Sequence, residues 1–509
     1  MNKLLSRTVT SLLAVAILVG FSGGEALSAS PAPSPPPAST TSADPVVPPV
    51  PPVSIRVGLG KSFTTLKLTA EGSFRVVNAA TNQLITTGQG GQLIESAPAG
   101  SGIRVAGKGV FTGPIRIVPG SSDQPGSNPT TSPASNPPSG SGAATSQASN
   151  PAPNPTQSGP TGFVRREDGR RYRGEFEVFR NSAGLLTLVN VVPLEDYLLG
   201  VVPREMPPSW PAEALKAQAV AARTYALYQV DGGKYEDDGF DVVDTTDSQV
   251  YGGVNSEDPR SNQAVWDTKD QIVTYNGKVI DAFFHASSGG YTENSENVFS
   301  AVLPYIRGVP DFDQDFPGFN WTRAFTLAEL EKAFSEAGYN TGALYAIAPI
   351  GPKGVSGRYT AFRLAGSSGS LSVKSSTVRG LLGLRSTLFE VLPHEEEIGD
   401  FQRAYQGETA VSVAGGTVTR RSLAGTTILG AGGVRRRVSG GTGVTALGRQ
   451  KLPGRVEFVG RGWGHGLGLS QWGARGMALK GYKYNQILSY YYSGTVVTPR
   501  SNLGPAALR

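Results

Sequence analysis

One glutamate lies in a stretch whose apolar neighbours could shield an acidic side chain from water. Glu205 lies in "VVPREMPPSWPAEA" (201–214), where four prolines restrict the backbone and where Met206 and Trp210 add apolar surface. Apolar surroundings disfavour a charged carboxylate, so they raise the pKa of a glutamate and keep it protonated near neutral pH. Glu205 is therefore a candidate general acid. The structural alternative is a helix-capping glutamate, or one in a salt bridge with Arg204 or Arg223.

A second stretch combines backbone freedom with rigid rings. "GRGWGHGLGLSQWGARGMA" (460–478) holds seven glycines, with Trp463, His465, Gln471 and Trp472 among them. Glycine loses the most conformational freedom on folding, so this density indicates close backbone approach. The tryptophans offer flat faces for a sugar ring, and His465 and Gln471 offer hydrogen bonds. The alternative is that this segment is a buried structural seam. Sugar binding and a structural seam are compatible, because a buried segment can form the floor of a binding groove.

A third stretch, "FFHASSGGYTENSENVF" (283–299), places His285 at the end of an apolar strand, followed by Ser287. His285 could orient a substrate or form a hydrogen bond within the core, and the sequence does not decide between these roles. The serines lack the G-x-S-x-G elbow of a serine hydrolase. Glu293 and Glu296 make no recognisable zinc spacing with His285. The segment "DFDQDF" (311–316) lacks the glycine and glutamate of a calcium loop, so we expect no metal or other cofactor.

These segments need elements to position them. Residues 211–229, "PAEALKAQAVAARTYALYQ", predict a long alanine-rich helix with Ser209 as a plausible cap. Lys216 and Arg223 are seven residues apart and share one face of that helix. Residues 193–202 predict a shorter helix, and further helices are expected near 326–338, from Ser470, and at 484–494. Alternating runs predict strands in 53–118, 174–192 and 271–287.

The chain as a whole is long, cysteine-free and modestly basic. It has 509 residues, no cysteine and a formal net charge of +6. Lys3 and Arg7 precede an apolar run (12–21) and small residues near Ala29, which predicts an export signal; an uncleaved N-terminal anchor is the alternative. No later stretch is long enough for a transmembrane helix. Basic clusters at 164–173 and 435–437 suit anionic wall polymers or lipid headgroups, or are solvated loops, and no nucleic-acid motif accompanies them.

The composition divides the chain into segments. We expect a signal peptide at 1–29, a proline-rich linker at 30–52, a β-rich part at 53–118 and a disordered insertion rich in Pro, Ser and Gly at 119–160. A mixed α/β domain follows at 161–495, with a tail at 496–509. We interpret 119–160 as an insertion into one β-rich region, and the fold class as α+β.

A family resemblance rests on three stretches taken in order, 197–227, 283–299 and 460–495, together with the segments "IRVGL" (55–59) and "TLVNVVPLEDYLLGVVPREMP" (187–207). The chain resembles the SpoIID/LytB family of exported bacterial cell-wall proteins over 53–118 and 161–495. The likeness implies action on peptidoglycan glycan strands, and a periplasmic or wall location. Active members are lytic transglycosylases on glycan stripped of its stem peptides. Others are described as enhancers of a cell-wall amidase, which is the alternative function and the candidate partner.

The resemblance also implies roles for residues. Glu205 matches the family's catalytic acid. In some members the histidine matched by His285 binds zinc with two cysteines, and that site cannot form in a chain without cysteine. We expect substrate-binding residues among a wider set: His285, Ser287, Trp463, His465, Gln471, Lys216 and Arg223.

A single carboxyl suffices for a lytic transglycosylase. It protonates the leaving oxygen, and the muramic acid 6-hydroxyl then attacks the anomeric carbon and leaves a 1,6-anhydro end. A hydrolase usually adds a second carboxylate. Four acidic residues lie near enough in sequence to be considered for that second role: Glu195, Asp196, Glu213 and Asp247. A peptidase or amidase activity is not indicated, because the chain has no cysteine nucleophile and its three histidines give no convincing zinc triad.

Overall fold

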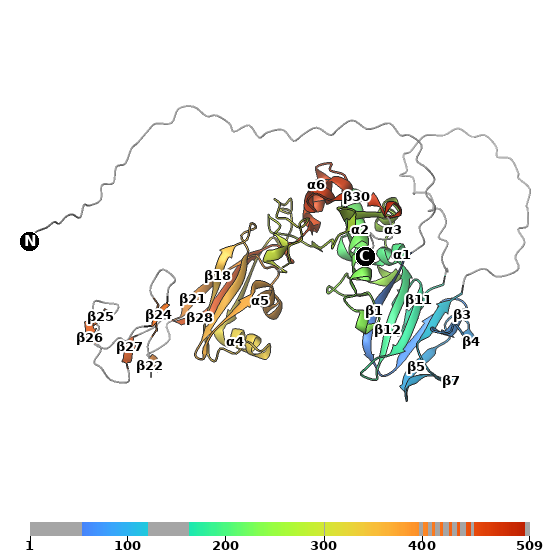
Figure 1. The fold of residues 1–509 in the computed structure, drawn as a ribbon, viewed down its shortest axis with the longest axis horizontal. Helices are drawn as coiled ribbons and strands as arrows, with labels where there is room; N and C mark the ends of the chain where they lie inside the picture. Colours follow the sequence, from blue (N-terminus) through green and yellow to red (C-terminus); the bar gives the residue numbers. More distant parts are fainter. Residues whose placement is uncertain are drawn as a thin grey trace, which may run out of the picture. The chain divides into compact units, whose positions relative to one another are not determined.

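The computed structural model describes residues 53–120, 162–299, 301–396 and 452–503, and the backbone of short strands between 401 and 448. The fold is α+β with a β-rich N-terminal part, as the sequence predicted, and seven α-helices occur among the described residues (Figure 1). The expected signal peptide, the proline-rich linker and all of the insertion beyond Gly120 lie outside the described residues.

The N-terminal part consists of two sheets. Their strands are β1 (Ser54–Phe63), β2 (Leu66–Ala70), β3 (Phe74–Asn78), β4 (Leu84–Gly88), β5 (Ile94–Ala99), β6 (Gly102–Val105), β7 (Gly109–Phe111), β8 (Ile115–Pro119), β9 (Val164–Arg166), β10 (Arg171–Tyr172), β11 (Glu175–Arg180), β12 (Leu186–Pro193) and β13 (Val242–Val243). One sheet has the order β13-β1-β12-β11-β8-β3-β4, and the other has the order β10-β9-β2-β5-β6-β7.

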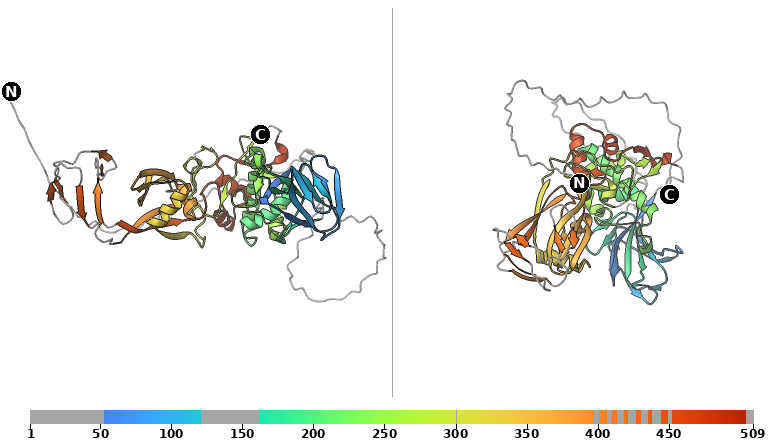
Figure 2. Two further views of the ribbon diagram at one scale, coloured as in Figure 1. Left: turned by 90° about the horizontal axis from the view of Figure 1, so that it is seen from below. Right: turned by 60° about the vertical axis from the view of Figure 1, so that its left-hand side comes forward.

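Strands from before and after residues 119–160 pair within the same sheets. β1 runs antiparallel to β12, with Ile55 opposite Val192, and β8 pairs with β11. In the second sheet β2 pairs with β9. Both views of Figure 2 show the strands before the insertion beside those that follow it. The insertion thus leaves and re-enters one β-rich region.

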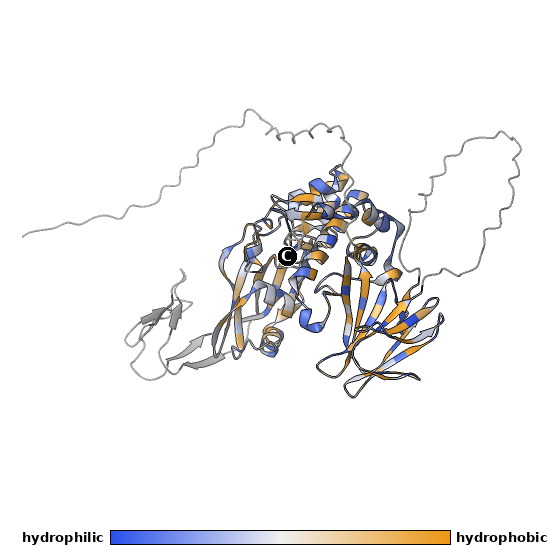
Figure 3. Ribbon diagram, turned by 45° about the vertical axis from the view of Figure 1, so that its right-hand side comes forward, coloured by the Kyte–Doolittle hydropathy of each residue, from blue (hydrophilic) through white to orange (hydrophobic). Residues whose placement is uncertain are grey.

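Side-chain alternation explains why these segments form sheets. Along β8, Ile115 and Ile117 are fully buried while Arg116 and Val118 are partly exposed. Such a period of two places one face of a strand on the core. Figure 3 shows hydrophobic and hydrophilic residues alternating along these strands.

Five helices carry the motifs: α1 (Leu194–Glu205), α2 (Ala212–Gly232), α3 (Pro259–Asp267), α6 (Gln471–Leu479) and α7 (Tyr484–Tyr491). Helices α1 and α2 contact the first sheet, and α3, α6 and α7 pack against α2. Short 3₁₀ turns are η1 (Glu236–Asp238), η2 (Gly253–Ser256), η3 (Ser295–Asn297) and η4 (Arg500–Asn502). Small sheets connect this region through β14 (Gln271–Tyr275), β15 (Lys278–Val279), β16 (Phe284–His285), β29 (Leu469–Ser470) and β30 (Val496–Pro499).

Local sequence sets the ends of the two central helices. Acidic Glu195 and Asp196 lie in the first turn of α1, where they complement the helix dipole. The N-cap of α2 is Pro211, so the prediction that Ser209 caps this helix is wrong. Pro211 lies directly before the helix and, having no backbone N–H, leaves no donor unpaired there. Gly233 ends α2 in the left-handed conformation, with φ of 62°.

The two C-terminal helices follow their sequence signals more closely. Ser470 caps α6 as predicted, because its hydroxyl accepts a hydrogen bond from Gly473 N–H. Tyr491 and Tyr492, at the end of α7, are fully buried, as expected for tyrosines that pack inward. The segment expected to be a tail begins with β30, which pairs with β14.

A second hydrophobic cluster forms around residues 321–391 and 456–458. Its elements are β17 (Asn320–Thr326), α4 (Leu327–Glu336), β18 (Leu344–Lys353), β19 (Tyr359–Gly366), β20 (Gly369–Lys374), α5 (Ser375–Leu382), β21 (Phe389–Glu396) and β28 (Leu452–Arg461). In Figure 1, α4 and α5 lie beside these strands. Between β21 and β28 run the short strands β22 (Phe401–Tyr405), β23 (Ala410–Ser412), β24 (Val418–Arg420), β25 (Thr427–Leu429), β26 (Arg435–Arg437) and β27 (Val444–Gly448).

Candidate active site

Glu205 is the last residue of α1, at the corner where the chain turns toward α2. The next residue, Met206, is fully buried and ends the helix in an extended conformation. A turn follows in which Trp210 N–H donates to the carbonyl of Pro207 at 3.0 Å. This corner leaves Glu205 half-buried.

Both carboxylate oxygens of Glu205 accept a hydrogen bond. Val250 N–H donates to Oε1 at 2.9 Å, and Gln471 Nε2 donates to Oε2 at 3.1 Å. Burial is the largest influence and raises the pKa of Glu205, while the two hydrogen bonds and the charge of Arg204 oppose the rise. The carboxyl is therefore easier to protonate than an exposed glutamate, yet its charged form keeps two fixed donors.

The alternative roles considered for Glu205 do not match its contacts. Arg223 forms its salt bridge with Glu195, at 2.7 Å, and Glu205 belongs to no salt bridge among the described residues. Glu205 also lies at the C-terminal end of α1, whereas a capping carboxylate stabilises an N-terminal end.

The backbone donor at Val250 is held by its neighbours. Gln249 is fully buried; it accepts from the hydroxyl of Tyr197 at 3.2 Å and donates to the carbonyl of Ala222 at 3.2 Å. On the other side, the hydroxyl of Tyr251 donates to Asn190 Oδ1 at 2.9 Å. These buried bonds fix the loop from which Val250 N–H points at Glu205.

The side-chain donor is held by a second amide. Gln471 is the first residue of α6, and its Nε2 also lies 3.4 Å from Gln218 Oε1 on α2. Gln218 is fully buried, and its own Nε2 has no hydrogen-bond partner among the described residues. Glu205, Gln471 and Gln218 thus form a connected group in which two amides line up behind the carboxylate.

An aromatic strip, which we define as Trp210, Trp472, Phe316 and Trp463, begins beside this group. The ring centroids of Trp210 and Trp472 lie 4.8 Å apart, those of Trp472 and Phe316 lie 5.4 Å apart, and those of Phe316 and Trp463 lie 6.4 Å apart. Trp472 directly follows Gln471, and Trp463 is 47% exposed. The strip is therefore a partly exposed apolar surface that starts at the acid.

The glycine-rich segment is a seam that supports this strip. At Gly462, with φ of 74°, an added Cβ would lie 2.6 Å from the carbonyl oxygen of Ser287. At Gly466, with φ of 83°, it would lie 2.5 Å from the guanidinium of the buried Arg358. Trp463 nevertheless keeps an exposed face, so the structure combines the seam with an open edge.

His285, His465 and Ser287 lie within that seam. His285 Nδ1 and the carbonyl of Leu467 are 3.0 Å apart, and His465 Nε2 and the carbonyl of Phe284 are also 3.0 Å apart. Burial lowers the pKa of His285 well below its usual value and lowers that of His465 to about 3, so both rings are neutral. Ser287 Oγ donates to Asp313 Oδ2 at 2.5 Å. None of the three has a hydrogen bond with Glu205.

Lys216 and Arg223 serve contacts within the helical region. Arg223 is 1% exposed and donates to Glu195 and to the carbonyls of Val265 and Gln271. Lys216 Nζ lies 2.8 Å from Asp267 Oδ2. Of the predicted substrate-binding residues, the structure therefore brings Gln471 to Glu205 and places Trp463 on the adjoining strip.

Several residues of the site had no sequence signal. Val250 contributes a backbone N–H, and because every residue except proline has one, its residue type gives no sequence signal. Phe316 comes from the loop "DFDQDF" (311–316), which from sequence was considered only as a calcium loop. Gln218 had a weak signal, as a polar residue within the alanine-rich run of α2.

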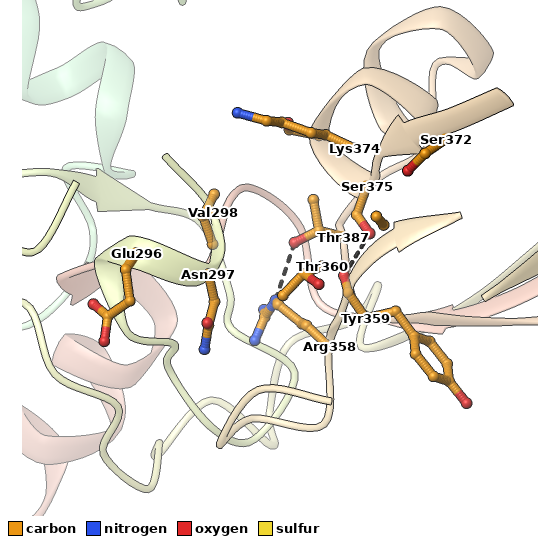
Figure 4. A pocket seen from close by; sticks show the side chains of 12 residues that line it. Glu296, Asn297, Val298, Arg358, Tyr359, Thr360, Ser372, Lys374, Ser375 and Thr387 are labelled. Atoms are coloured by element: carbon orange, nitrogen blue, oxygen red, sulfur yellow. Dashed lines mark hydrogen bonds between the residues drawn. The ribbon is translucent and has the colours of Figure 1, made fainter. Parts of the chain in front are cut away.

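Neither a neighbouring cavity nor a metal cluster among the described residues adds to this site. A cavity of about 310 Å³ lies between residues 296–298 and the region of β19, β20 and α5, and Glu205 does not line it (Figure 4). Its buried Arg358 donates to Thr387 Oγ1 at 3.1 Å. Within the part of the chain that the structure describes, no three acidic or histidine side chains group as metal ligands, and no helix is long and apolar enough to cross a membrane.

The fold and site define an α+β protein with one desolvated glutamate beside an aromatic surface. Comparison with known proteins identifies the family to which it belongs. The profile of SpoIID, stage II sporulation protein, matches residues 182–275, which include Glu205. The chain is 30% identical over 324 residues to stage II sporulation protein D of Bacillus subtilis, covering 61% of this chain and 76% of that protein. The chain belongs to the SpoIID family, as its motifs predicted, and so has a role related to the bacterial cell wall.

Two further relatives are similar over the same extent. An uncharacterized protein of Brachyspira hyodysenteriae is 32% identical over 311 residues, covering 61% of this chain and 67% of that protein. The amidase enhancer of Bacillus subtilis is 32% identical over 308 residues, covering 59% of this chain and 40% of the enhancer. The chain thus spans less than half the length of the amidase enhancer.

Proposed function

We propose that the protein is a lytic transglycosylase that cleaves peptidoglycan glycan strands, with Glu205 as acid and then base. One observation carries this proposal. Glu205 is desolvated, belongs to no salt bridge among the described residues, accepts two fixed hydrogen bonds, and adjoins an aromatic strip suited to sugar rings. A carboxyl that needs both protonation states in one cycle requires this balance of burial and donors.

The reaction proceeds in two proton transfers. Protonated Glu205 gives its proton to the glycosidic oxygen while the bond from that oxygen to the anomeric carbon breaks. The 6-hydroxyl oxygen of the same muramic acid residue then bonds to the anomeric carbon, and the Glu205 carboxylate takes the hydroxyl proton. The products are a free sugar end and a 1,6-anhydro end, no water is consumed, and Glu205 is protonated again.

The hydrogen bonds favour the intermediate stage of this cycle. Val250 N–H and Gln471 Nε2 stabilise the carboxylate that the first proton transfer creates, and both donors are already in place. Burial meanwhile favours the acid that begins the cycle. The pKa of Glu205 therefore reflects two opposed effects, each of which serves one half of the reaction.

Two of the four acidic residues considered as second carboxylates are engaged elsewhere. Glu195 pairs with Arg223, and Glu213 accepts from Tyr484 N–H at 2.9 Å. Burial raises the pKa of Asp196, opposed by Arg173. None of these three shares a hydrogen-bond partner with Glu205 among the described residues, and the products of the reaction decide between the one-carboxyl mechanism and hydrolysis.

A test compares products of two proteins on one substrate. Peptide-stripped glycan strands are digested with residues 30–509 and with the Glu205→Gln variant, and the ends are identified by mass. We expect anhydro ends from the wild type, and a rate about 10²- to 10⁴-fold lower for Glu205→Gln because general acid catalysis is lost. Glu236→Gln, on the surface, is the matched control. Hydrated reducing ends would instead mean hydrolysis.

The second candidate function is a non-catalytic enhancer of a cell-wall amidase. The resemblance to the amidase enhancer of Bacillus subtilis favours it. The aromatic strip would then hold glycan without cutting it. A folded wild type that binds the strands, leaves them uncut and accelerates an added wall amidase would establish this function in place of the first.

A further inference from the structure

We propose that Arg475 and Arg385, stacked on the aromatic strip, make this surface a binding site for saccharides that carry free carboxylates. The location of the cut within such a saccharide rests on the proposed function, but the binding does not. The ligand is recognised in two ways, with its apolar ring faces on the aromatic side chains and its acid groups on the two guanidinium ions.

Arg475 is the cation at the end of the strip near Glu205. Its guanidinium carbon lies 5.2 Å from the ring centroid of Trp472 and 6.0 Å from that of Trp210. Its one ionic contact among the described residues is with Asp315, at 3.4 Å, and the Asp315 side chain is 73% exposed. Water screens an ion pair whose carboxylate is this exposed, so a ligand carboxylate can compete with Asp315 for Arg475.

Arg385 is the cation at the other end. It is exposed, follows α5, and its guanidinium carbon lies 5.1 Å from the ring centroid of Trp463. Across the described residues it takes part in no salt bridge, although the ring holds its guanidinium in place. The strip therefore has a positive charge at each end, and within the described part of the chain no carboxylate forms a salt bridge with Arg385.

The ring contacts leave N–H groups of both arginines available to a ligand. A guanidinium has five N–H donors, and a contact with a ring does not use them all. In-plane donors match the two oxygens of a carboxylate, and this bidentate geometry is the strongest that arginine forms. A neutral sugar polymer would use the rings but would supply no carboxylate to either cation.

Two sources in a bacterial wall supply this chemistry. One is the lactyl group of muramic acid, whose carboxylate is free only when no stem peptide is attached through an amide. The other is a polysaccharide that contains uronic acids. Both present carboxylates on pyranose rings, so the shared ligand class is an acidic saccharide.

The experiment measures binding with cleavage removed. The Glu205→Gln protein is titrated calorimetrically with four probes: peptide-free glycan strands, the same strands with their carboxylates converted to methyl amides, chitin oligosaccharides, and a polyuronate. We expect the peptide-free strands to bind about tenfold more tightly than the amidated strands, since a charge-assisted pair is lost in the latter. High salt should reduce the difference.

Variants assign the preference to the two arginines. In the Glu205→Gln protein, a further Arg475→Gln or Arg385→Gln substitution should weaken binding of the acidic strands severalfold and leave chitin binding unchanged. Arg323→Gln is the matched control, since Arg323 is also exposed and stacks on a ring, Phe325, at 5.3 Å. The proposal is overturned if amidated and acidic strands bind alike, or if the arginine variants bind both as the parent protein does. Tighter binding of the muramic strands or of the polyuronate identifies the source.

The binding result and the cleavage result can fail separately. If the wild type cuts no glycan but these binding preferences hold, the proposed enzymatic function fails and the acidic-saccharide site stands. If the wild type cuts glycan, and the arginine variants cut acidic and amidated strands at the parent ratio, the arginine assignment fails alone.

Discussion

At the scale of single residues, the orientation of one amide governs the acid. Gln471 Nε2 faces both Glu205 Oε2 and Gln218 Oε1, and both of these atoms are acceptors. A flipped Gln471 would put its carbonyl oxygen against two acceptor oxygens, which electrostatics disfavours. Gln218 therefore positions Gln471, and a buried, unpaired Nε2 on Gln218 accompanies that arrangement. Such an orphan donor normally costs stability, which is consistent with a functional constraint.

Removing this donor should change the pH dependence of the reaction. A hydrogen bond to the charged form lowers a pKa, so Gln471→Leu should raise the pKa of Glu205 above its already raised value. The first step needs protonated Glu205, and activity on glycan strands falls as pH rises through that pKa. We expect the alkaline limb of the kcat/KM profile to move to higher pH in Gln471→Leu, with a lower maximal rate because the carboxylate loses a donor.

Gln263→Leu, which removes an exposed amide on α3, is the matched control and should keep the wild-type profile. An alkaline limb that stays in place in Gln471→Leu, or that moves to lower pH, would contradict the assignment of Gln471 as the donor to Glu205.

At the scale of elements, α2 is the support on which the site is assembled. Six of its seven alanines are fully buried, and it carries Gln218 while packing against α1, α3, α6 and α7. Small side chains allow these helices to approach closely, and α1 and α6 bring Glu205 and Gln471 together. The interior of α2 is close-packed, so added volume there must displace a neighbouring helix.

Enlarging one buried alanine should therefore destabilise the fold. Ala219→Leu overpacks α2 and is expected to lower the free energy of unfolding by about 1–3 kcal/mol, measured by chemical denaturation. Ala212→Leu, at the exposed start of the same helix, should change it by less than about 0.5 kcal/mol. Equal effects at both positions would show that close packing of α2 is not what stabilises this region.

The elements also show how far the sequence could predict the site. The Ser470 cap of α6 is a local signal and was predicted correctly. The first helix was expected over 193–202, but α1 includes Pro203 and ends at Glu205, so the prolines alone did not place the end of the helix that carries the acid. The contact between Glu205 and Gln471 joins residues 266 positions apart, and no local pattern encodes it. Phe316 and Arg385 reach the strip from loops whose course depends on the packing around the second hydrophobic cluster, so their part in the site required the structure.

At the scale of the whole molecule, the insertion between β8 and β9 begins and ends at one place. A Cβ added to Gly162 would lie 3.0 Å from the carbonyl oxygen of Gly120, so the two backbones are adjacent. Gly120 N–H donates to the carbonyl of Ser73, and Glu71 N–H donates to the carbonyl of Phe163. The same short stretch of chain thus holds both ends of the insertion.

Because its ends meet, the insertion should be removable. We expect that replacing residues 121–161 with a four-residue Gly-Ser link leaves the sheets intact and raises the free energy of unfolding by up to about 2 kcal/mol, since a shorter loop loses less entropy on closure. Chemical denaturation of both proteins measures this difference. Glycan binding by the Glu205→Gln form should be the same with and without the insertion, because Glu205 and the aromatic strip lie on other segments. A protein that folds normally but binds glycan more weakly would instead assign the insertion a part in binding the wall.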